Sequence, residues 1–450
     1  MWSAWSTETY LSPGGRGMRV SGILSSVKWL YPGMRVKRWL ILVPFGLAIA
    51  IAGVVLTANI SMFDILEQVS RGAYRLLGID LSRPAMQLGI GAGLVLLGLL
   101  LIFVSLRQVV RSIMSVVRPE FQGKLADVVF QRRYLSQGQM VVVLGGGTGL
   151  ATLLRGLKQY TSNICAVVTV TDDGGSSGRL QREMGVLPPG DIRNCLVALA
   201  DAEPMMTELF QYRFSESHNG LEGHSFGNLL IAAMTQITGD FERAVKETSN
   251  ILAIRGRVLP STIEQVRLHA ELEDGTLAEG ETQIVRSPCA IKHIMLHPST
   301  VKPLDETLRA IELADCIVMG PGSVYTSIIP NILVRGMAEA IHASDAVKIY
   351  VCNVMTQPGE TDGYTASDHV RAVANHADRR VFHQVLVNQE RPSKELLDKY
   401  AAQKQFFVEP DIAEIREMGY RPIVGDYINQ TDVVRHDPNK LAEAILRLVA

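Results

Sequence analysis

The amino-acid sequence predicts an α/β protein in which a doubly wound, mostly parallel sheet with an antiparallel insertion follows a two-helix transmembrane hairpin. Two long uncharged segments lie near the N-terminus, and short apolar, β-rich runs alternate with helical patterns from residue 139 onward. The first of these runs ends in a cluster of glycines. Runs that are apolar throughout are typical of parallel strands covered by helices on both faces.

The two uncharged segments, Trp39–Ala58 and Met86–Leu106, are each long enough to cross a bilayer as a helix. A buried core helix, or a signal sequence for the first segment, is the alternative. Basic residues flank the pair on the outside and favour both ends in the cytoplasm: Arg35, Lys37, Arg38, Arg107, Arg111 and Arg118. We therefore expect a two-span protein of the cell membrane that contacts the lipid bilayer through residues 39–106, with its C-terminal domain in the cytoplasm.

The 450 residues are expected to form four parts. These are a poorly ordered N-terminal segment (1–38), the transmembrane hairpin (39–106), an amphipathic linker (107–138) and an α/β domain (139–450). The linker fits either a helix along the membrane surface or a solvated helix. A net charge of −1 gives no basic field, so no nucleic-acid partner is expected. The five cysteines are widely spaced and contain no Cys-x-x-Cys pair, which indicates reduced thiols.

Within the α/β domain, apolar runs between helical patterns predict five strands of the parallel sheet: Met140–Leu144, Ile164–Thr171, Cys316–Met319, Val347–Val351 and Val381–Val387. One stretch differs, because Val266 to Leu272 alternates apolar and polar residues before an Asp274-Gly275 turn. This pattern predicts an antiparallel hairpin inserted in the domain.

The first strand runs into a glycine-rich turn at the start of a helical pattern. Backbone N–H groups without side chains can approach an anion closely, so the turn predicts a site for a phosphate, and hence for a nucleotide. The residues are Gly145, Gly146, Gly147, Thr148 and Gly149. Leu150 stands where a dinucleotide fingerprint needs glycine, and no Gly-Lys-Ser/Thr follows as in a P-loop. An ordinary tight turn between strand and helix would give the same pattern.

The second strand is followed by Asp172 and Asp173, then by Ser176 and Ser177. An acidic residue here could contact a ribose hydroxyl, or the two carboxylates could hold Mg²⁺ beside a phosphate. The serines would donate hydrogen bonds to the phosphate. An ordinary Asp-Gly loop is the plainer alternative, and Mg²⁺ is a candidate cofactor only on the metal interpretation.

Further candidate groups follow at turns and helix starts. Asp191 fits a helix N-cap, and Arg193 and Asn194 would lie in the first turn, within reach of an anion. Other predicted nucleotide- or phosphate-binding residues follow in three clusters: His224, Ser225 and Asn228, then Gly320, Gly322 and Ser323, then Asn353. Because parallel strands end at one edge of a sheet, we expect the strand-end groups to converge there. The sequence contains no Ser-His-Asp, metalloprotease or kinase signature.

Residues 139–450 closely resemble the YvcK family of gluconeogenesis factors, which is similar to the CofD-like 2-phospho-L-lactate transferases. The matching stretches are Gly145–Leu150, Asp172–Leu180, Pro189–Asn194, Gly223–Ser225, Gly320–Ser323, Asn353–Gly363 and Arg435–Pro438. The resemblance implies a Rossmann-like nucleotide-binding domain with a role in bacterial cell shape and in carbon and cell-wall metabolism. It also implies a UDP-linked amino sugar as ligand and regulatory protein partners. A homodimer would be an ordinary assembly.

Three functions remain open at this stage. The first is a nucleotide-sugar sensor that binds without turnover. The second is a CofD-like transferase, which would move a phospholactyl group from a guanylylated donor to a deazaflavin with Mg²⁺; Asp172, Asp173 and Asp191 would then be the catalytic residues. The third, an oxidoreductase that uses a dinucleotide, is disfavoured by the missing third glycine. Whether the chain is an enzyme is therefore left open, and the sensor is the favoured interpretation.

Overall fold

The computed structural model describes residues 37–57, 84–117, 133–201, 204–215, 220–430 and 433–449. The chain divides into two compact units, residues 1–129 and 130–450, which are described separately below. The predicted N-terminal segment (1–38) lies outside the described residues except at its very end.

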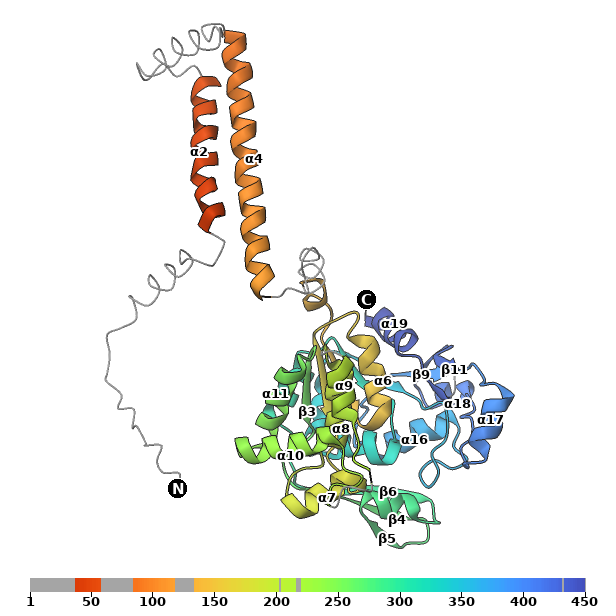
Figure 1. Cartoon of the computed structure of the whole chain (residues 1–450). Helices are drawn as coiled ribbons and strands as arrows, with labels where there is room; N and C mark the ends of the chain where they lie inside the picture. Colours follow the sequence, from red (N-terminus) through yellow and green to blue (C-terminus); the bar gives the residue numbers. More distant parts are fainter. Residues whose placement is uncertain are drawn as a thin grey trace, which may run out of the picture. The chain divides into compact units, whose positions relative to one another are not determined.

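The N-terminal unit contains two long helices, α2 (Lys37–Thr57) and α4 (Pro84–Val117), which pack side by side (Figure 1). Glycines face each other where the helices meet: a Cβ on Gly98 would lie 2.5 Å from the Gly46 carbonyl oxygen. The backbones therefore approach closely, as small residues allow in helix pairs. Large apolar side chains elsewhere on both helices are exposed, including those of Phe45, Leu96 and Phe103.

By length and composition, both helices could cross a membrane, over Trp39–Thr57 and Leu88–Ser112. The second helix is longer than the predicted span, since it continues to Val117. The first part of the predicted linker (107–138) is therefore a continuation of α4. Residues 118–132 of the linker lie outside the described residues.

The second unit is built on a seven-stranded sheet with the order β10-β9-β8-β7-β1-β2-β3, in which every neighbouring pair is parallel. Its strands are β1 (Val141–Gly145), β2 (Ile164–Val168), β3 (Arg257–Pro260), β7 (Cys316–Met319), β8 (Val347–Val351), β9 (Gln384–Asn388) and β10 (Arg421–Gly425). The strand order reverses between β1 and β7. Open α/β sheets bind ligands in the crevice at such a switch point.

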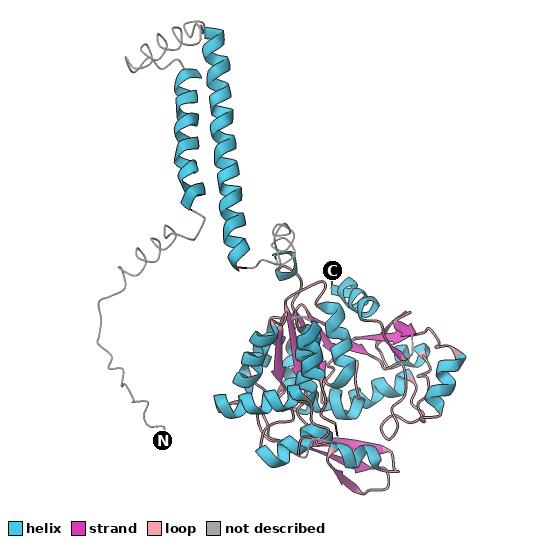
Figure 2. Ribbon diagram, in the orientation of Figure 1, coloured by secondary structure: helices cyan, strands magenta, loops and turns pink. Residues whose placement is uncertain are grey.

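Helices cover both faces of this sheet, which confirms the predicted α/β architecture (Figure 2). They are α6 (Gly147–Leu157), α7 (Gly175–Met184), α8 (Gly190–Leu199), α9 (Pro204–Gln211), α10 (Phe226–Thr238), α11 (Phe241–Leu252), α13 (Asp305–Glu312), a π-helical turn η3 (Val324–Ile328), α14 (Ile329–Leu333), α15 (Met337–Ala343), α16 (Ala366–His376), α17 (Lys394–Ala401), α18 (Ile412–Glu417) and α19 (Pro438–Val449). The central strands are fully enclosed: β1 pairs with β2 and β7 in register, and its residues Val141–Leu144 are 0% exposed.

The predicted antiparallel insertion is also present. It is a separate three-stranded sheet of β4 (Arg267–Leu272), β5 (Leu277–Glu279) and β6 (Ile291–His297), with a short helix α12 (Glu281–Arg286) between β5 and β6. Leu268, Ala270 and Leu272 are buried, whereas the residues between them are more exposed, as the alternating sequence pattern requires. Two further short strands, β11 (Ile428–Gln430) and β12 (Val434–His436), pair near the C-terminus.

Sequence patterns did not predict the two edge strands, β3 and β10. Each is short and contains a proline, Pro260 in β3 and Pro422 in β10. Proline weakens the expectation of a strand because it cannot donate a ladder hydrogen bond, yet an edge strand tolerates it. The inner strands β7 and β8 have the predicted bounds, since their runs are apolar and fully covered.

Candidate functional site

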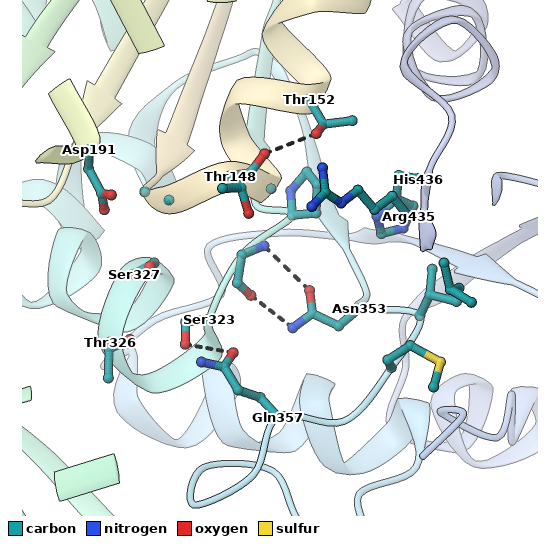
Figure 3. Close-up of a pocket in the computed structure, with 18 of the residues that line it drawn as sticks. Thr148, Thr152, Asp191, Ser323, Thr326, Ser327, Asn353, Gln357, Arg435 and His436 are labelled. Carbon is teal, nitrogen blue, oxygen red and sulfur yellow. Dashed lines mark hydrogen bonds between the residues drawn. The ribbon is translucent and has the colours of Figure 1, made fainter. Parts of the chain in front are cut away.

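A cavity of about 420 Å³ lies at the carboxyl ends of the strands around the switch point between β1 and β7 (Figure 3). Nine residues of the predicted site line it: Gly146, Gly147, Thr148, Gly149, Asp172, Asp191, Gly322, Ser323 and Asn353. Eight of them follow the strands β1, β2, β7 and β8, and Asp191 lies in the first turn of α8. The topology of the sheet therefore brings them together. A cavity of this size lies in the ordinary range of small-molecule sites.

The glycine turn after β1 forms one wall of the cavity and begins helix α6. Gly146 is the N-cap and supplies no side-chain cap, and the first turn of the helix contains no acidic residue. The first N–H groups of a helix have no intrahelical partner and attract anions. Two glycines are required by close approach: a Cβ on Gly146 would lie 2.4 Å from Asp191 Oδ2, and one on Gly149 would lie 2.6 Å from the Pro321 carbonyl oxygen.

Gly147 differs from these two glycines. Its φ is +64°, and a Cβ on it would meet no atom within 4 Å. It lines the cavity, so the space that a side chain would take is free for a ligand. Gly147 therefore combines a left-handed backbone with a bare approach to the cavity.

The loop after β7 forms the second wall and is held by Asn353. The Asn353 amide donates from Nδ2 to the Gly322 carbonyl at 2.9 Å, and its Oδ1 accepts from the Gly322 N–H at 3.4 Å (Figure 3). The Ser323 hydroxyl donates to Gln357 Oε1 at 2.8 Å. Asn353 lines the cavity as predicted, but both ends of its amide engage the loop. Its geometry therefore supports a role in shaping the site.

Carboxyl groups gather on another side of the cavity. Asp172 accepts from the Gly174 N–H at 2.9 Å, and burial raises its pKa. Burial and the neighbouring Asp172 raise the pKa of Asp191 to about 6. Burial, followed by the charges of Asp172 and Asp191, raises the pKa of Glu281 to about 9. The cluster therefore resists full ionisation, which suits a ligand that supplies hydrogen bonds or a cation.

The opposite side of the cavity carries Arg435 and His436 from β12. In Figure 3 these two residues lie on one side and Asp191 on the other, with Thr148 between them. Burial lowers the pKa of His436 to about 4, so its ring is neutral at physiological pH. Val354, Met355 and Val434 add apolar lining. The cavity thus has an acidic side, a helix N-terminus and a basic, partly apolar side.

Several predicted site residues lie behind the cavity in a buried hydrogen-bond network that joins α7, α8 and α10. Arg193 Nη1 donates to Asn228 Oδ1 at 3.1 Å and to the Ser225 hydroxyl. Asn228 Nδ2 donates to Ser176 Oγ at 3.1 Å, and Ser176 Oγ bonds His224 Nδ1 at 2.9 Å. None of these five side chains is among the residues that line the cavity. Burial lowers the pKa of both Arg193 and His224.

The remaining predicted residues support the site in other ways. Ser177 donates to Asp172, and Asn194 Oδ1 accepts from Arg193 Nη2 at 2.7 Å. Gly145 ends β1, and its carbonyl accepts from Asn331 at 3.1 Å. Gly320, with φ +81°, precedes a cis peptide bond to Pro321. Direct contact between these residues and a ligand stays a prediction.

Two aspartates have surroundings that their sequence context does not indicate. Pro189, not Asp191, is the N-cap of α8, because the helix begins at Gly190. Asp191 instead lies in the first turn, with its carboxylate against the glycine turn after β1. Asp173 does not line the cavity, and its Oδ1 accepts from the Thr282 N–H at 2.9 Å and from the Thr282 hydroxyl at 2.7 Å, so a Mg²⁺ site shared with Asp172 stays a prediction.

Among the described residues, no group of three or more His, Cys, Asp or Glu side chains is arranged to hold a metal ion. Mg²⁺ is commonly held by one or two carboxylates together with the phosphates of its ligand. Asp172 and Asp191, which both line the cavity, fit such a partial site better than the adjacent pair Asp172 and Asp173.

Sequence reasoning missed several lining residues. They are Thr152, Glu281, Ser327 and Val434. Pro321, Val354, Met355, Gln357, Arg435 and His436 were noted only within stretches that match the family, and Thr326 only as part of the turn after the Cys316–Met319 strand. Glu281 comes from the antiparallel insertion, and no local pattern marks it. The place of Glu281 at the cavity follows only from the tertiary structure, in which the insertion packs beside the cavity.

Known proteins match this chain over most of the α/β unit. The family model for 2-phospho-L-lactate transferase CofD matches residues 141–428. A relative from Bacillus subtilis, named gluconeogenesis factor, is 48% identical over 316 residues, which cover 70% of this chain and 99% of that protein. A crystal structure from Bacillus halodurans, described as a member of the upf0052 family, has a TM-score of 0.67 and 50% identity. That match covers 69% of this chain and 99% of that one.

Another relative, from Nostoc sp. (strain PCC 7120), also carries the gluconeogenesis factor name and extends the match. It is 48% identical over 427 residues, which cover 93% of this chain and 92% of that protein. This alignment is longer than the α/β unit and so reaches into the N-terminal unit, whereas the match to the Bacillus subtilis relative is shorter than the α/β unit. The chain therefore belongs to the gluconeogenesis factor (YvcK) family, with a CofD-type domain over residues 141–428.

Proposed function

We propose that this chain is a membrane-anchored, cytosol-facing regulatory protein that binds a UDP-linked sugar in the cavity between β1 and β7. Through this binding it would couple the supply of cell-wall precursors and carbon metabolism to cell shape, together with regulatory protein partners. The observation that supports the proposal most is the meeting of the α6 N-terminus with the loop after β7 at the topological switch point.

The groups along the cavity match the parts of a nucleotide sugar. The N–H groups at the start of α6, beside Thr148, suit a diphosphate. Apolar side chains near Arg435, those of Met355 and Val434, suit the face of a base. Carboxyl groups on the far side suit the hydroxyl groups of a sugar, because they accept hydrogen bonds and, when protonated, also donate them.

The two N-terminal helices support the membrane part of the proposal. Their outward apolar side chains have no cover within the described part of their unit, and both helices have the length of a span. Because the CofD family model matches residues 141–428, inside the α/β unit, we assign ligand binding to that unit and location at the membrane to the helices.

A CofD-like transferase is the second candidate, and the matching family model favours it. In that case Asp172 and Asp191 would hold Mg²⁺ against the phosphates of a guanylylated donor, where the metal neutralises developing charge. Asp173, which sequence reasoning placed in this role, is engaged by Thr282 instead. The sensor is favoured because a relative named putative gluconeogenesis factor matches 93% of this chain, beyond the CofD-type domain of residues 141–428.

Two assays on the full-length chain in detergent micelles separate these functions. Isothermal titration calorimetry with UDP-N-acetylglucosamine, UDP, GDP and ADP should give the highest affinity for the UDP-sugar. Incubation with a guanylylated phospholactate, a deazaflavin and Mg²⁺ should give no product by mass spectrometry. Turnover that is lost in Asp191→Asn would replace the sensor with the transferase.

Membrane anchoring is tested by fractionation of cells that produce the full-length chain or residues 130–450. The full-length chain should remain in the membrane pellet after carbonate extraction and be released by detergent, whereas residues 130–450 should be soluble. A full-length chain that is released by carbonate would contradict the two-span arrangement.

A further inference from the structure

We infer that Glu281 recognises the glycosyl end of the bound nucleotide sugar, and that Asp173 is the positioning residue that holds Glu281 at the cavity. This inference rests on the proposed function and adds the orientation of the ligand, that is, which end of the cavity holds the sugar and which holds the base. It also assigns a role in ligand binding to the antiparallel insertion, since Glu281 is the residue of that insertion that lines the cavity.

The side chain of Glu281 lines the cavity and makes no contact that stabilises the fold through a hydrogen bond or ion pair within the described residues. Glu281 is the first residue of α12, and its side chain is partly buried against the cavity. Within the described part of the chain, no hydrogen bond or ion pair of its carboxyl group is found, whereas Glu279 on the same insertion pairs with Arg267 at 2.7 Å. A partly buried carboxyl without a protein partner has hydrogen-bonding capacity left for a ligand.

The backbone on both sides of Glu281 is fixed on Asp173. On one side, the Asp173 carboxylate accepts from the N–H and the hydroxyl of Thr282. On the other side, Gly280 has φ +87°, and a Cβ there would lie 2.0 Å from Asp173 Oδ2. The loop after β2 therefore clamps the start of α12, and Glu281 lies between the two clamped residues. This accounts for an aspartate in the glycine-rich loop that does not itself line the cavity.

The acidic side chains near Glu281 determine which kind of ligand group can bind there. Asp172, Asp191 and Glu360 all disfavour its ionised form, after burial itself. A second negative group such as a phosphate would be repelled at this end of the cavity. The carboxyl group of Glu281, which lines the cavity, can accept hydrogen bonds from the hydroxyl and amide groups of a sugar.

The opposite end of the cavity is suited to the base. Val354, Met355 and Val434 provide apolar surface beside Arg435. Thr148, at the start of α6, lies between Asp191 and the pair Arg435 and His436 in Figure 3. A diphosphate at the helix N-terminus therefore leaves the base at the Arg435 end and the sugar at the carboxyl end, where Glu281 lies.

Calorimetry with UDP and with UDP-N-acetylglucosamine tests this direction, on the full-length chain and its Glu281→Ala variant. The variant should bind the UDP-sugar about tenfold more weakly than the unmodified chain, because it loses hydrogen bonds in a partly buried site. Its affinity for UDP should change by less than about twofold. Glu281→Gln, which keeps a donor and an acceptor, should retain most of the preference for the sugar.

The matched control is Glu279→Ala, which removes the same side chain two residues earlier on the exposed face of the insertion and should change neither affinity. Asp173→Ala should lower the ratio of UDP-sugar to UDP affinity in the same direction as Glu281→Ala. If Asp173 had a purely structural role, Asp173→Ala would lower the affinities for both ligands equally. Thermal unfolding of each variant without ligand shows whether the fold is intact.

Other outcomes overturn the inference. If Glu281→Ala lowers the affinities for UDP and for the UDP-sugar equally, or lowers neither, Glu281 does not bind the sugar. An effect that disappears when Mg²⁺ is replaced by EDTA would assign Glu281 to a cation. If the unmodified chain binds neither UDP nor the UDP-sugar, the proposed function fails together with the inference.

Discussion

Two walls of the same cavity differ in what builds them. The glycine wall, Gly146–Gly149 with the loop Pro321–Ser323, presents mainly backbone and is fixed by close contacts such as the one between Gly149 and Pro321. The carboxyl wall, Asp172, Asp191 and Glu281, presents side chains from three separate segments, each with a raised pKa. Substitutions in the glycine wall should therefore abolish binding, whereas those in the carboxyl wall should tune it.

The largest effect is expected from Gly147→Val. The side chain would enter open space in the cavity where the phosphates are expected, so nucleotide-sugar affinity should fall by about 100-fold or more. Gly185→Val is the matched control, because Gly185 has a similar φ of +67° and open surroundings but does not line the cavity. Both variants should lose similar stability, and only Gly147→Val should lose binding in calorimetry. Unchanged affinity in Gly147→Val would remove the glycine wall from the site.

A second prediction concerns the network behind the walls. Asn228→Ala should destabilise the fold by about 1–3 kcal/mol, because it removes one of the hydrogen-bond partners of the buried Arg193 guanidinium and one of those of the Ser176 hydroxyl. Denaturant unfolding of the α/β unit measures this loss. Ligand affinity should change little at temperatures where the variant is folded. A large loss of affinity with normal stability would instead place Asn228 in contact with the ligand.

A third prediction tests charge on the carboxyl wall. Burial and Asp172 raise the pKa of Asp191 to about 6, so this group gains a proton as the pH falls from 7.5 to 5.5. The affinity for UDP-N-acetylglucosamine in EDTA should then rise about three- to tenfold, because less negative charge faces the diphosphate. Asp191→Asn should bind more tightly at pH 7.5 and show little of this pH dependence. The same rise in both proteins would assign it to another group.

The last prediction concerns the dependence of stability on pH. The folded-state pKa of Glu281, about 9, lies above that of an ordinary glutamate, so the folded state holds the proton more tightly than the unfolded state. The stabilising contribution is complete at low pH and is lost as the pH rises toward 9. Glu281→Gln should therefore flatten the fall in melting temperature between pH 7 and pH 9. A fall of unchanged slope would show that Glu281 does not titrate in this range.

The contrast between the walls also explains how much could be predicted. The glycine wall is local in sequence: an apolar run that ends in glycines before a helical pattern predicts both β1 and the turn that follows it. The inner strands were predicted for the same reason. Convergence of separate strand ends followed from the general topology of parallel sheets, and the structure places nine of the predicted residues around one cavity.

The carboxyl wall depends on tertiary contacts that no spacing encodes. Asp172 and Asp173 are neighbours in sequence, yet one faces the cavity and the other binds Thr282, more than a hundred residues later in the chain. Glu281 is placed by that same contact. His224 and Asn228 have residue types typical of a site, but burial directs them into a supporting network. Residue type alone could not distinguish these two environments.

The most direct test is a crystal structure of residues 130–450 soaked with UDP-N-acetylglucosamine, since these residues form a compact unit and a protein that matches 69% of this chain has been crystallised. We expect the diphosphate oxygens within hydrogen-bonding distance of the N–H groups of Thr148 and Gly149, at the start of α6. A diphosphate bound away from this turn, with the cavity between β1 and β7 empty, would contradict the central claim.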